Sequence, residues 1–234
     1  MTFLASNCAQ FDAFAKNYDE ALSKGLSITG EGPAFYAEKR VVVTRLLIRP
    51  KRVPTEKILD FGCGIGTSIP FLAEAFAPTE IVGVDVSEKI LAEARARVDL
   101  THVRFEPVEQ TPRGGEIDLV YCNGVFHHIK PEQHAEAFQR IFDSLRSAGY
   151  FALWENNPLN PGTHLIMAKC PFDRDAKPIL PCQATKMLIA TGFRIETVLS
   201  RFFFPRLLAF LRPLEPWLSP SLLGGQYLVL ARKP

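Results

Sequence analysis

Long apolar runs, a concentration of charge of one sign and paired cysteines are all missing from this 234-residue chain. No apolar stretch approaches the roughly 20 residues needed to cross a bilayer, and no basic segment followed by an apolar core stands at the start. The net charge is only +2, and the 27 Lys and Arg residues are scattered, which disfavours nucleic acid as a partner. We therefore expect a cytoplasmic protein without a transmembrane segment.

The cysteines argue against a secreted fold held together by disulfides. They are odd in number and contain no C-x-x-C pair: Cys8, Cys63, Cys122, Cys170 and Cys182. Cys170 and Cys182 flank one loop and could share a disulfide or a metal, but ordinary buried thiols in a reducing compartment are the favoured interpretation. We expect no metal centre.

The most informative feature that is present is a glycine-rich turn after a short apolar strand. Residues 58–66 read Ile-Leu-Asp-Phe-Gly-Cys-Gly-Ile-Gly, with Thr67 where a dinucleotide-binding G-x-G-x-x-G turn would carry its third glycine. Glycines at alternate positions let main-chain amides approach a nucleotide-like ligand directly. A second strand ends in Asp85, 19 residues after Gly66, where a carboxylate can accept hydrogen bonds from both ribose hydroxyls.

These residues resemble the class I S-adenosylmethionine (SAM)-dependent methyltransferases, specifically bacterial small-molecule enzymes of the type 11-like group. The resemblance extends to Phe105-x-x-x-Glu109, to the strand and turn at residues 117–128 and to Trp154-Glu-Asn-Asn, and it covers roughly residues 46–232. At residues 147–149, Ser-Ala-Gly replaces the usual Pro-Gly-Gly turn. The nearest rival, a nicotinamide oxidoreductase, is disfavoured by Thr67.

The resemblance implies one cofactor, SAM, and a set of residues around it. Asp60 would act near the methionine moiety, Asp85 would hold the ribose, and Glu109 would border the adenine. The full set expected at the cofactor is Tyr18, Asp60, Gly62, Cys63, Gly64, Gly66, Asp85, Val86, Glu109, Gln110, Asn123 and Gly124.

On the acceptor side, the pair of histidines after the fourth strand is the leading candidate for catalysis. His127 and His128 follow the strand whose end faces the transferred methyl group in the resembled family, and an acceptor that must lose a proton benefits from a positioned base. Each could instead bind backbone or shape the pocket. Residues expected to touch the acceptor are Phe35, Tyr36, His128, Glu155 and Asn156.

The pattern of elements predicts a single α/β domain over residues 1–234. Strands near 57–61, 80–85, 103–106, 117–122 and 149–155 alternate with helices, which requires a mainly parallel sheet covered on both faces. The last strands, near 193–204 and 226–232, should form the antiparallel edge. The resemblance thus implies a Rossmann-like seven-stranded methyltransferase sheet, with residues 1–45 as a helical lid whose Gly30–Tyr36 stretch is mobile.

Residues 205–225 are unusually apolar for a connection between two strands. They contain eight leucine or aromatic side chains before Leu223, interrupted by Pro213, Pro216 and Pro220. Three interpretations remain open: a helix packed over the sheet or against a second copy, a wall or lid over the acceptor pocket, and a weak contact with a membrane surface.

Together, these features predict transfer of the SAM methyl group to a small molecule with an aromatic or partly apolar portion, most simply to oxygen. Nitrogen and carbon acceptors remain open, because the donor half of the site is the same for all three. A SAM-binding partner protein without turnover is the alternative from another class. We expect a monomer or a homodimer.

Overall fold

The computed structural model describes residues 12, 14–173 and 176–234. The strands of this part of the chain are β1 (Lys57–Phe61), β2 (Glu80–Asp85), β3 (Val103–Pro107), β4 (Ile117–Asn123), β5 (Leu145–Asn156), β6 (Arg194–Arg201) and β7 (Gln226–Arg232). Within the described residues they form one seven-stranded sheet in the order β3-β2-β1-β4-β5-β7-β6. Only β7 runs antiparallel to its neighbours, β5 and β6.

Helices occupy most of the connections. They are α2 (Tyr18–Leu26), α3 (Pro33–Ile48), α4 (Ile69–Phe76), α5 (Glu88–Arg97), α6 (His134–Ser144), α7 (Pro161–Lys169), α8 (Pro181–Thr191) and α9 (Glu215–Leu218), with 3₁₀ segments η6 (Phe126–His128), η8 (Pro171–Asp173) and η9 (Arg206–Leu214). Local sequence sets several ends. The Ser87 hydroxyl accepts a hydrogen bond from Ile90 N and so caps α5, and Gly192 ends α8 in the left-handed conformation.

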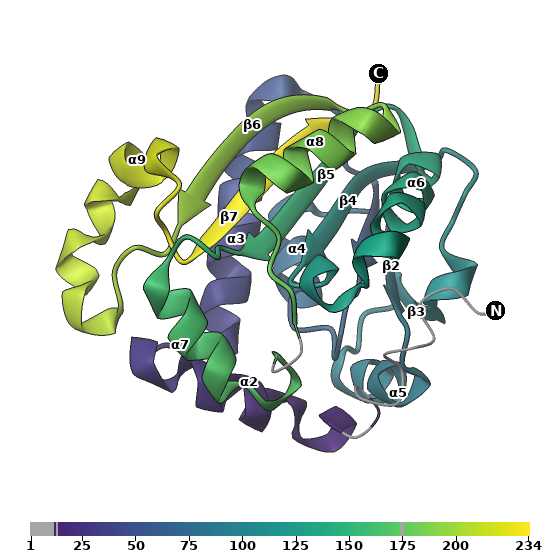
Figure 1. Ribbon diagram of the computed structural model, residues 1–234. Coiled ribbons are helices and arrows are strands. Elements are labelled where there is room, and N and C mark those ends of the chain that lie inside the picture. The colour runs from purple at the N-terminus through teal and green to yellow at the C-terminus, as the bar shows by residue number, and fades with distance from the viewer. Residues whose placement is uncertain (1–11, 13, 174–175) are drawn as a thin grey trace.

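The sheet has a buried core on each face. Phe138 and Ile141 of α6 and Leu188 of α8 pack on one face, while α3, α4 and α5 pack on the other. Figure 1 shows α6 and α8 in front of the sheet and α3 and α4 behind it. Because successive strand residues point to opposite faces, Ile58 joins one core and Leu59 the other. Both faces are therefore closed, and only the edges and strand ends remain accessible to a ligand.

The carboxyl ends of the central parallel strands meet at one edge of the sheet. Helices α2 and α7 contact each other beyond this edge, where Figure 1 shows them below the strands. Ligands of open parallel sheets bind at such an edge. The fold thus places the glycine-rich turn, Asp85 and the histidine pair around one space.

Several boundaries differ from the sequence-based expectations, and β5 begins at Leu145 and not near residue 149. Strand β6 ends at Arg201 and not near residue 204, because the Glu215 carboxylate accepts the amide hydrogens of residues 202–204 that a longer ladder would have used. The Gly30–Tyr36 stretch is not a loop throughout, since α3 begins at Pro33 and carries Phe35 and Tyr36 in its first turn.

Of the helical lid expected at residues 1–45, the structure describes residue 12 and residues 14–45. Cys8 lies outside the described residues. None of the described helices is long and apolar enough to cross a bilayer.

Candidate active site

The glycine-rich turn is fastened to β2 by its own backbone. The amides of Gly62 and Cys63 donate to Val84 O, and the amide of Gly64 donates to Asp85 Oδ2 at 3.0 Å. Gly62 and Gly64 both have positive φ, but for different reasons. A Cβ on Gly62 would lie 2.2 Å from Val125 Cγ2, whereas one on Gly64 would point toward the Tyr18 ring at 3.6 Å or more. Gly62 is thus required by packing, and Gly64 leaves open space above the backbone.

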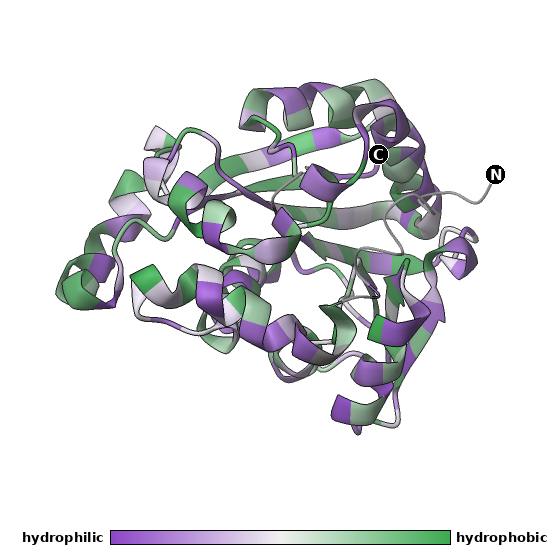
Figure 2. Cartoon of the chain, turned by 60° about the horizontal axis from the view of Figure 1, so that its bottom comes forward, coloured by the Kyte–Doolittle hydropathy of each residue, from purple (hydrophilic) through white to green (hydrophobic). Residues whose placement is uncertain are grey.

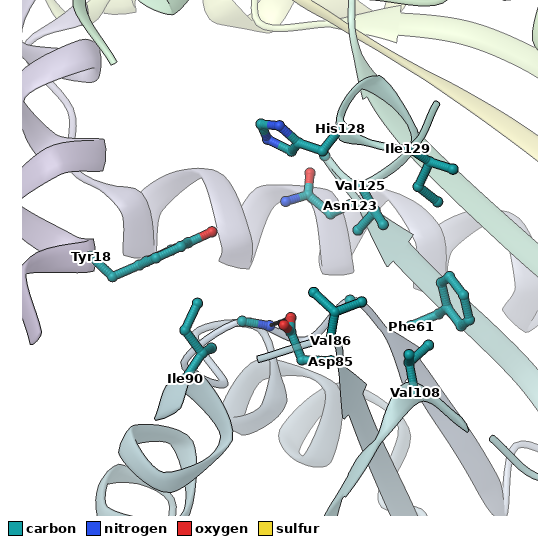
Figure 3. Close-up of a pocket in the computed structure, with 13 residues that line it drawn as sticks. Tyr18, Phe61, Asp85, Val86, Ile90, Val108, Asn123, Val125, His128 and Ile129 are labelled. Atoms are coloured by element: carbon teal, nitrogen blue, oxygen red, sulfur yellow. Dashed lines mark hydrogen bonds between the residues drawn. The ribbon is translucent and has the colours of Figure 1, made fainter. Parts of the chain in front are cut away.

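That open space is a small cavity of about 70 Å³. Figure 3 shows Tyr18 on one side, with its hydroxyl pointing inward, and Asp85 and Val86 on the other. The lining combines exposed main chain with apolar side chains: Tyr18, Phe61, Gly62, Gly64, Asp85, Val86, Ile90, Val108, Asn123, Gly124, Val125, His128 and Ile129. An apolar slot next to main-chain amides and a carboxylate suits a nucleoside.

Two carboxyl groups lie at the carboxyl ends of neighbouring strands. Asp85 lines the cavity, where its Oδ2 accepts from Gly64 N and its Oδ1 from Ser87 N. Burial raises the pKa of Asp85, although these amide contacts oppose the rise. Asp60 is buried beneath the turn and does not line the cavity, and burial together with the Asp85 charge raises its pKa to about 7. The structure therefore places Asp85 at the cavity wall and Asp60 behind it.

The far end of the cavity is formed by residues after β3. Val108 lines it and is buried, while the neighbouring Glu109 and Gln110 are exposed and do not line it. All three lie in one 3₁₀ turn, so the side chain that faces inward is one position earlier than the sequence suggested. Cys63 and Gly66, also expected at the cofactor, contribute to the turn but do not line the cavity.

Asn123, at the end of β4, carries an acceptor atom suited to a ligand. Its Oδ1 is buried and has no hydrogen-bond partner among the described residues, and its side chain lines the cavity. A buried polar atom without a partner is costly, so the geometry fits a hydrogen-bond donor supplied by a ligand. Together with the open space above Gly64, this observation shows that the cavity fits a nucleoside cofactor with polar substituents.

The two histidines of η6 differ in their surroundings. His127 lies between two carboxylates, with Nδ1 2.6 Å from Glu155 Oε2 and Nε2 3.5 Å from Asp173 Oδ1. The other Glu155 oxygen accepts from the amides of Val125 and Phe126. Glu155 is fully buried and lies outside the cavity linings, so it holds η6 in place and does not face a ligand.

These surroundings give the histidines opposite protonation states. Burial opposes the charge on His127, but the Glu155 and Asp173 carboxylates outweigh it and raise the pKa of His127 to about 10. Burial and the neighbouring charged His127 lower the pKa of His128. At neutral pH His127 is an imidazolium, while His128 is a neutral imidazole that can accept a proton.

The His127 proton also accounts for a cluster of metal-ligand residue types. His127, His128 and Asp173 bring their ligand atoms within 4.8 Å of one another. The imidazolium lies between Glu155 and Asp173 and neutralises one of their two negative charges, so the cluster includes a buried ion-pair network. Cys170 and Cys182 do not form a second candidate, because both are free, one buried and the other exposed.

A second, larger cavity of about 570 Å³ adjoins the first. The two share Tyr18, Asn123, Gly124 and His128 in their linings. The walls of the larger cavity come from α2, α3, α7, η8 and residues 201–216, and they are rich in aromatic side chains: Phe35, Tyr36, Phe172, Phe202, Phe203 and Phe204. Phe35, Tyr36 and Asn156, predicted for the acceptor side, all lie here.

Tyr18 connects the two cavities to the helices beyond the sheet edge. Its ring stacks on Phe172 with centroids 5.0 Å apart, and Phe172 precedes Asp173 in η8. The approach of Asp173 to His127 and His128 was not predicted from the sequence. Phe172 and Val108 were likewise not predicted. No short-range spacing signals these contacts, because they join elements that meet only in the folded chain.

Comparison with known proteins places the fold and the turn in a family. A family model described as a methyltransferase domain matches residues 58–149, which contain the glycine-rich turn, Asp85 and the histidine pair. Solved SAM-dependent methyltransferases share the architecture, among them one from Mesorhizobium loti with a TM-score of 0.57, 23% identity and coverage of 80% of this chain and 96% of that one. Residues 58–149 thus belong to the methyltransferase domain family, and the fold is the one seen in SAM-dependent methyltransferases.

Other methyltransferases match along different extents. Magnesium protoporphyrin IX methyltransferase from Synechocystis PCC 6803, solved with bound SAH, covers 97% of this chain and 98% of its own at a TM-score of 0.63 and 18% identity. Trans-aconitate 2-methyltransferase from Variovorax paradoxus is 32% identical over 147 residues, which are 58% of this chain and 53% of that protein. The enzyme of that name from Afipia carboxidovorans is 29% identical over 134 residues. The chain spans about half the length of these curated relatives.

Proposed function

We propose that this protein transfers the methyl group of SAM to an oxygen atom of a small molecule with a large apolar portion. The observation that carries the proposal is the junction of the two cavities. A small slot on the glycine turn opens, between Tyr18, Asn123 and His128, into an aromatic-lined cavity of about 570 Å³. SAM supplies an activated methyl group on a sulfonium, so the protein must mainly align the acceptor and exclude water.

The small cavity would hold the cofactor through groups of different kinds. Asp85 is placed for the ribose hydroxyls, and the backbone at Gly62 and Gly64 lets the ligand lie against the main chain. Val108 and Ile129 provide apolar surface for the adenine, while Asn123 Oδ1 offers an acceptor to a donor group. The Tyr18 ring, stacked on Phe172, excludes water on the open side.

The large cavity favours an apolar acceptor over a tricarboxylate such as the trans-aconitate named for the curated relatives. Three carboxylates would be held best by cations without partners, but each described Lys and Arg side chain of this cavity already contacts a polar group. Their partners are Gln226 and Tyr121 for Arg40, Glu31 for Arg212, Glu38 for Lys39 and the Glu215 carbonyl for Arg201. The aromatic walls would instead bury rings or alkyl chains, at about 25 cal/mol per Å² of apolar area.

His128 is the residue we assign as general base. It lies at the junction, is neutral at neutral pH, and its Nε2 is 3.2 Å from Asp173 Oδ1. His127 cannot take this role, because its raised pKa keeps it protonated, and it serves as the charged partner that holds Asp173 beside His128.

The test is a two-stage assay on the full chain. Isothermal titration calorimetry measures SAM binding, and mass spectrometry then detects methyl transfer from isotope-labelled SAM to apolar phenols, apolar carboxylic acids, amines and trans-aconitate. We expect SAM binding and a product with an apolar oxygen acceptor. Product from trans-aconitate but from none of the apolar acceptors would refute the acceptor class. SAM binding with no product across the panel and across cell extracts would favour the non-catalytic SAM-binding protein.

A further inference from the structure

Residues 206–218, in the connection between β6 and β7, keep their apolar side chains out of the core. No residue of η9 or α9 is buried, although Leu207, Leu208, Phe210, Leu211, Leu214, Trp217 and Leu218 make the stretch strongly apolar. Leu207 is 88% exposed, Trp217 85% and Phe210 74%. Figure 2 shows this segment projecting from the body of the protein at the left, with hydrophobic stretches on its outer side. An exposed apolar patch of this kind marks an interaction surface.

The segment is fixed in place by polar contacts and not by burial of its own apolar side chains. Glu215 accepts three amide hydrogens from residues 202–204, and Arg212 Nη2 lies 2.8 Å from Glu31 Oε1. The Arg212 guanidinium also stacks over Phe35 at 4.6 Å. These ties orient the chain while leaving Leu207, Phe210 and Trp217 directed away from the core. These contacts hold the segment of residues 206–218, called the platform below, in a defined position.

The platform borders the mouth of the larger cavity. Phe203, Phe204, Pro205 and Pro216 line the cavity, and the exposed residues follow them directly in the chain. Across the mouth, Leu46 of α3 lines the cavity and is 63% exposed. Apolar surface is thus continuous from the outside of the protein into the acceptor cavity. An apolar molecule could enter from a hydrocarbon layer without crossing water.

The charge of this region complements anionic headgroups. Arg206 on the platform is exposed, as are Arg45 on α3 and Arg49 directly after its end. The carboxylates of the same region are engaged: Glu31 by Arg212, Glu38 by Lys39 and Glu215 by backbone amides. Exposed Arg next to Trp, Phe and Leu is the composition of segments that bind at the lipid interface.

We infer that the platform of residues 206–218, together with the exposed side of α3, docks on the surface of an anionic lipid bilayer, from which an amphiphilic acceptor enters the larger cavity. Docking is independent of turnover, while the entry of the acceptor rests on the proposed function. A second copy of the chain is the less suitable occupant, because covering the platform and Leu46 with protein would also close the cavity mouth.

The experiment uses vesicles of phosphatidylcholine alone and with a quarter phosphatidylglycerol. Flotation should recover the full chain with the anionic vesicles and less with the neutral ones. The two tryptophans give a second readout, because Trp154 is fully buried and Trp217 is exposed. Vesicles should shift the emission to shorter wavelength, and brominated lipids should quench it. Both effects should disappear in Trp217→Phe.

Variants distinguish binding through the platform from non-specific hydrophobic adsorption to vesicles. Leu207→Ser combined with Phe210→Ser should lower partitioning at least roughly tenfold, and Arg206→Glu should lower it on anionic vesicles alone. The control is Ile189→Ser on α8, an exposed apolar residue 56% accessible and outside the platform, which should bind as the parent does. All these side chains are exposed, so thermal unfolding should change little.

The inference is overturned if the parent stays off both kinds of vesicle, or if Ile189→Ser lowers partitioning as much as the platform variants do. A concentration-dependent dimer in light scattering that the Leu207→Ser, Phe210→Ser variant abolishes would assign the platform to a second copy instead. SAM titrations of the same samples keep the two proposals apart. Intact SAM binding without vesicle binding rejects only the docking surface.

Discussion

The two cavities that meet at His128 are built in different ways. Apart from Tyr18 of α2, the smaller one is formed by main chain and side chains at or after the ends of the parallel strands β1, β2, β3 and β4, whose positions are fixed by the ladder. The larger one is formed by segments distant in sequence, from α2 and α3 to η8 and residues 201–216. The family match, residues 58–149, covers the first except for Tyr18, and almost none of the second.

This difference separates what the family shares from what belongs to this chain. A backbone-built cofactor slot tolerates little change, since a shift of one strand would break its ladder. The acceptor cavity depends on side chains and on a few polar ties, such as the contact of Arg212 with Glu31, and it can change its shape without disturbing the sheet. Changes in the cofactor slot should therefore remove SAM binding, and changes in the acceptor cavity should alter acceptor use alone.

The largest effect should follow substitution of Gly64 by valine. Its side chain would occupy the space above the turn, near Tyr18, so SAM affinity should fall by about 100-fold or more. The positive φ adds strain of roughly 1–2 kcal/mol, which should leave the chain folded. Calorimetry and circular dichroism measure both quantities. The matched variant Gly62→Val should instead unfold the chain, because its Cβ collides with Val125; equal behaviour of the two variants would contradict the distinction.

The second-largest effect should come from substitution of His128, at the junction of the two cavities. His128→Gln should lower kcat by roughly 100-fold to 10,000-fold while changing the SAM dissociation constant less than about threefold. In the parent, kcat/KM should rise with pH through the lowered pKa of His128 and level off above it. The variant should lose this acid limb. His164→Gln, which changes an exposed histidine, is the control. Full activity of His128→Gln at every pH would leave no histidine base.

Residues next to the central strands were predictable from sequence, because alternating strands and helices force strand ends to one edge. Gly62, Gly64, Asp85 and Asn123, predicted at the cofactor, and His128, predicted on the acceptor side, all line the small cavity. Glu109 shows the limit of that reasoning. In a 3₁₀ turn a shift of one residue changes which side chain points inward, and Val108 faces the cavity while Glu109 faces solvent.

For the acceptor half of the site, the sequence indicated which segments contribute but not which of their side chains face the cavity. The apolar character of residues 205–225 was visible in the sequence, but not that residues 203–205 and 216 line a cavity while 207, 210 and 217 face outward. Glu155 was expected to touch the acceptor, yet it turns back to bind η6 and His127. Its orientation depends on amides exposed by the η6 turn, which no spacing in the sequence reveals.

A smaller loss should follow removal of the Asp85 carboxylate. Asp85→Ala should weaken SAM binding at least tenfold, from a charge-assisted contact of roughly 1.5–3 kcal/mol. The variant also frees the amides of Gly64 and Ser87, so Asp85→Asn is the informative companion. It retains one acceptor oxygen and should lie between parent and alanine variant. Calorimetry showing the parental dissociation constant in Asp85→Ala would refute the ribose assignment.

The smallest effect should come from the tie between the platform and the start of α3. Arg212 contacts Glu31, donates to Phe204 O and stacks over Phe35, and all of these residues lie at the larger cavity or its rim. Arg212→Met keeps the length of the side chain but removes its charge and donors. A partly buried pair of this kind contributes about 1 kcal/mol, so the KM of the acceptor should rise roughly threefold to tenfold.

The control for this last change is Arg194→Met, which alters a mainly exposed arginine at the start of β6, away from the cavity. It should leave both substrates unaffected. Glu31→Gln should reproduce the effect of Arg212→Met, and the double variant should be no worse than either single one, because each single change already breaks the contact. SAM affinity should stay at the parental value throughout. A parallel loss of SAM affinity would show that the two halves of the site are coupled through Tyr18 and Phe172, since their stacked rings join the acceptor wall to the cofactor slot.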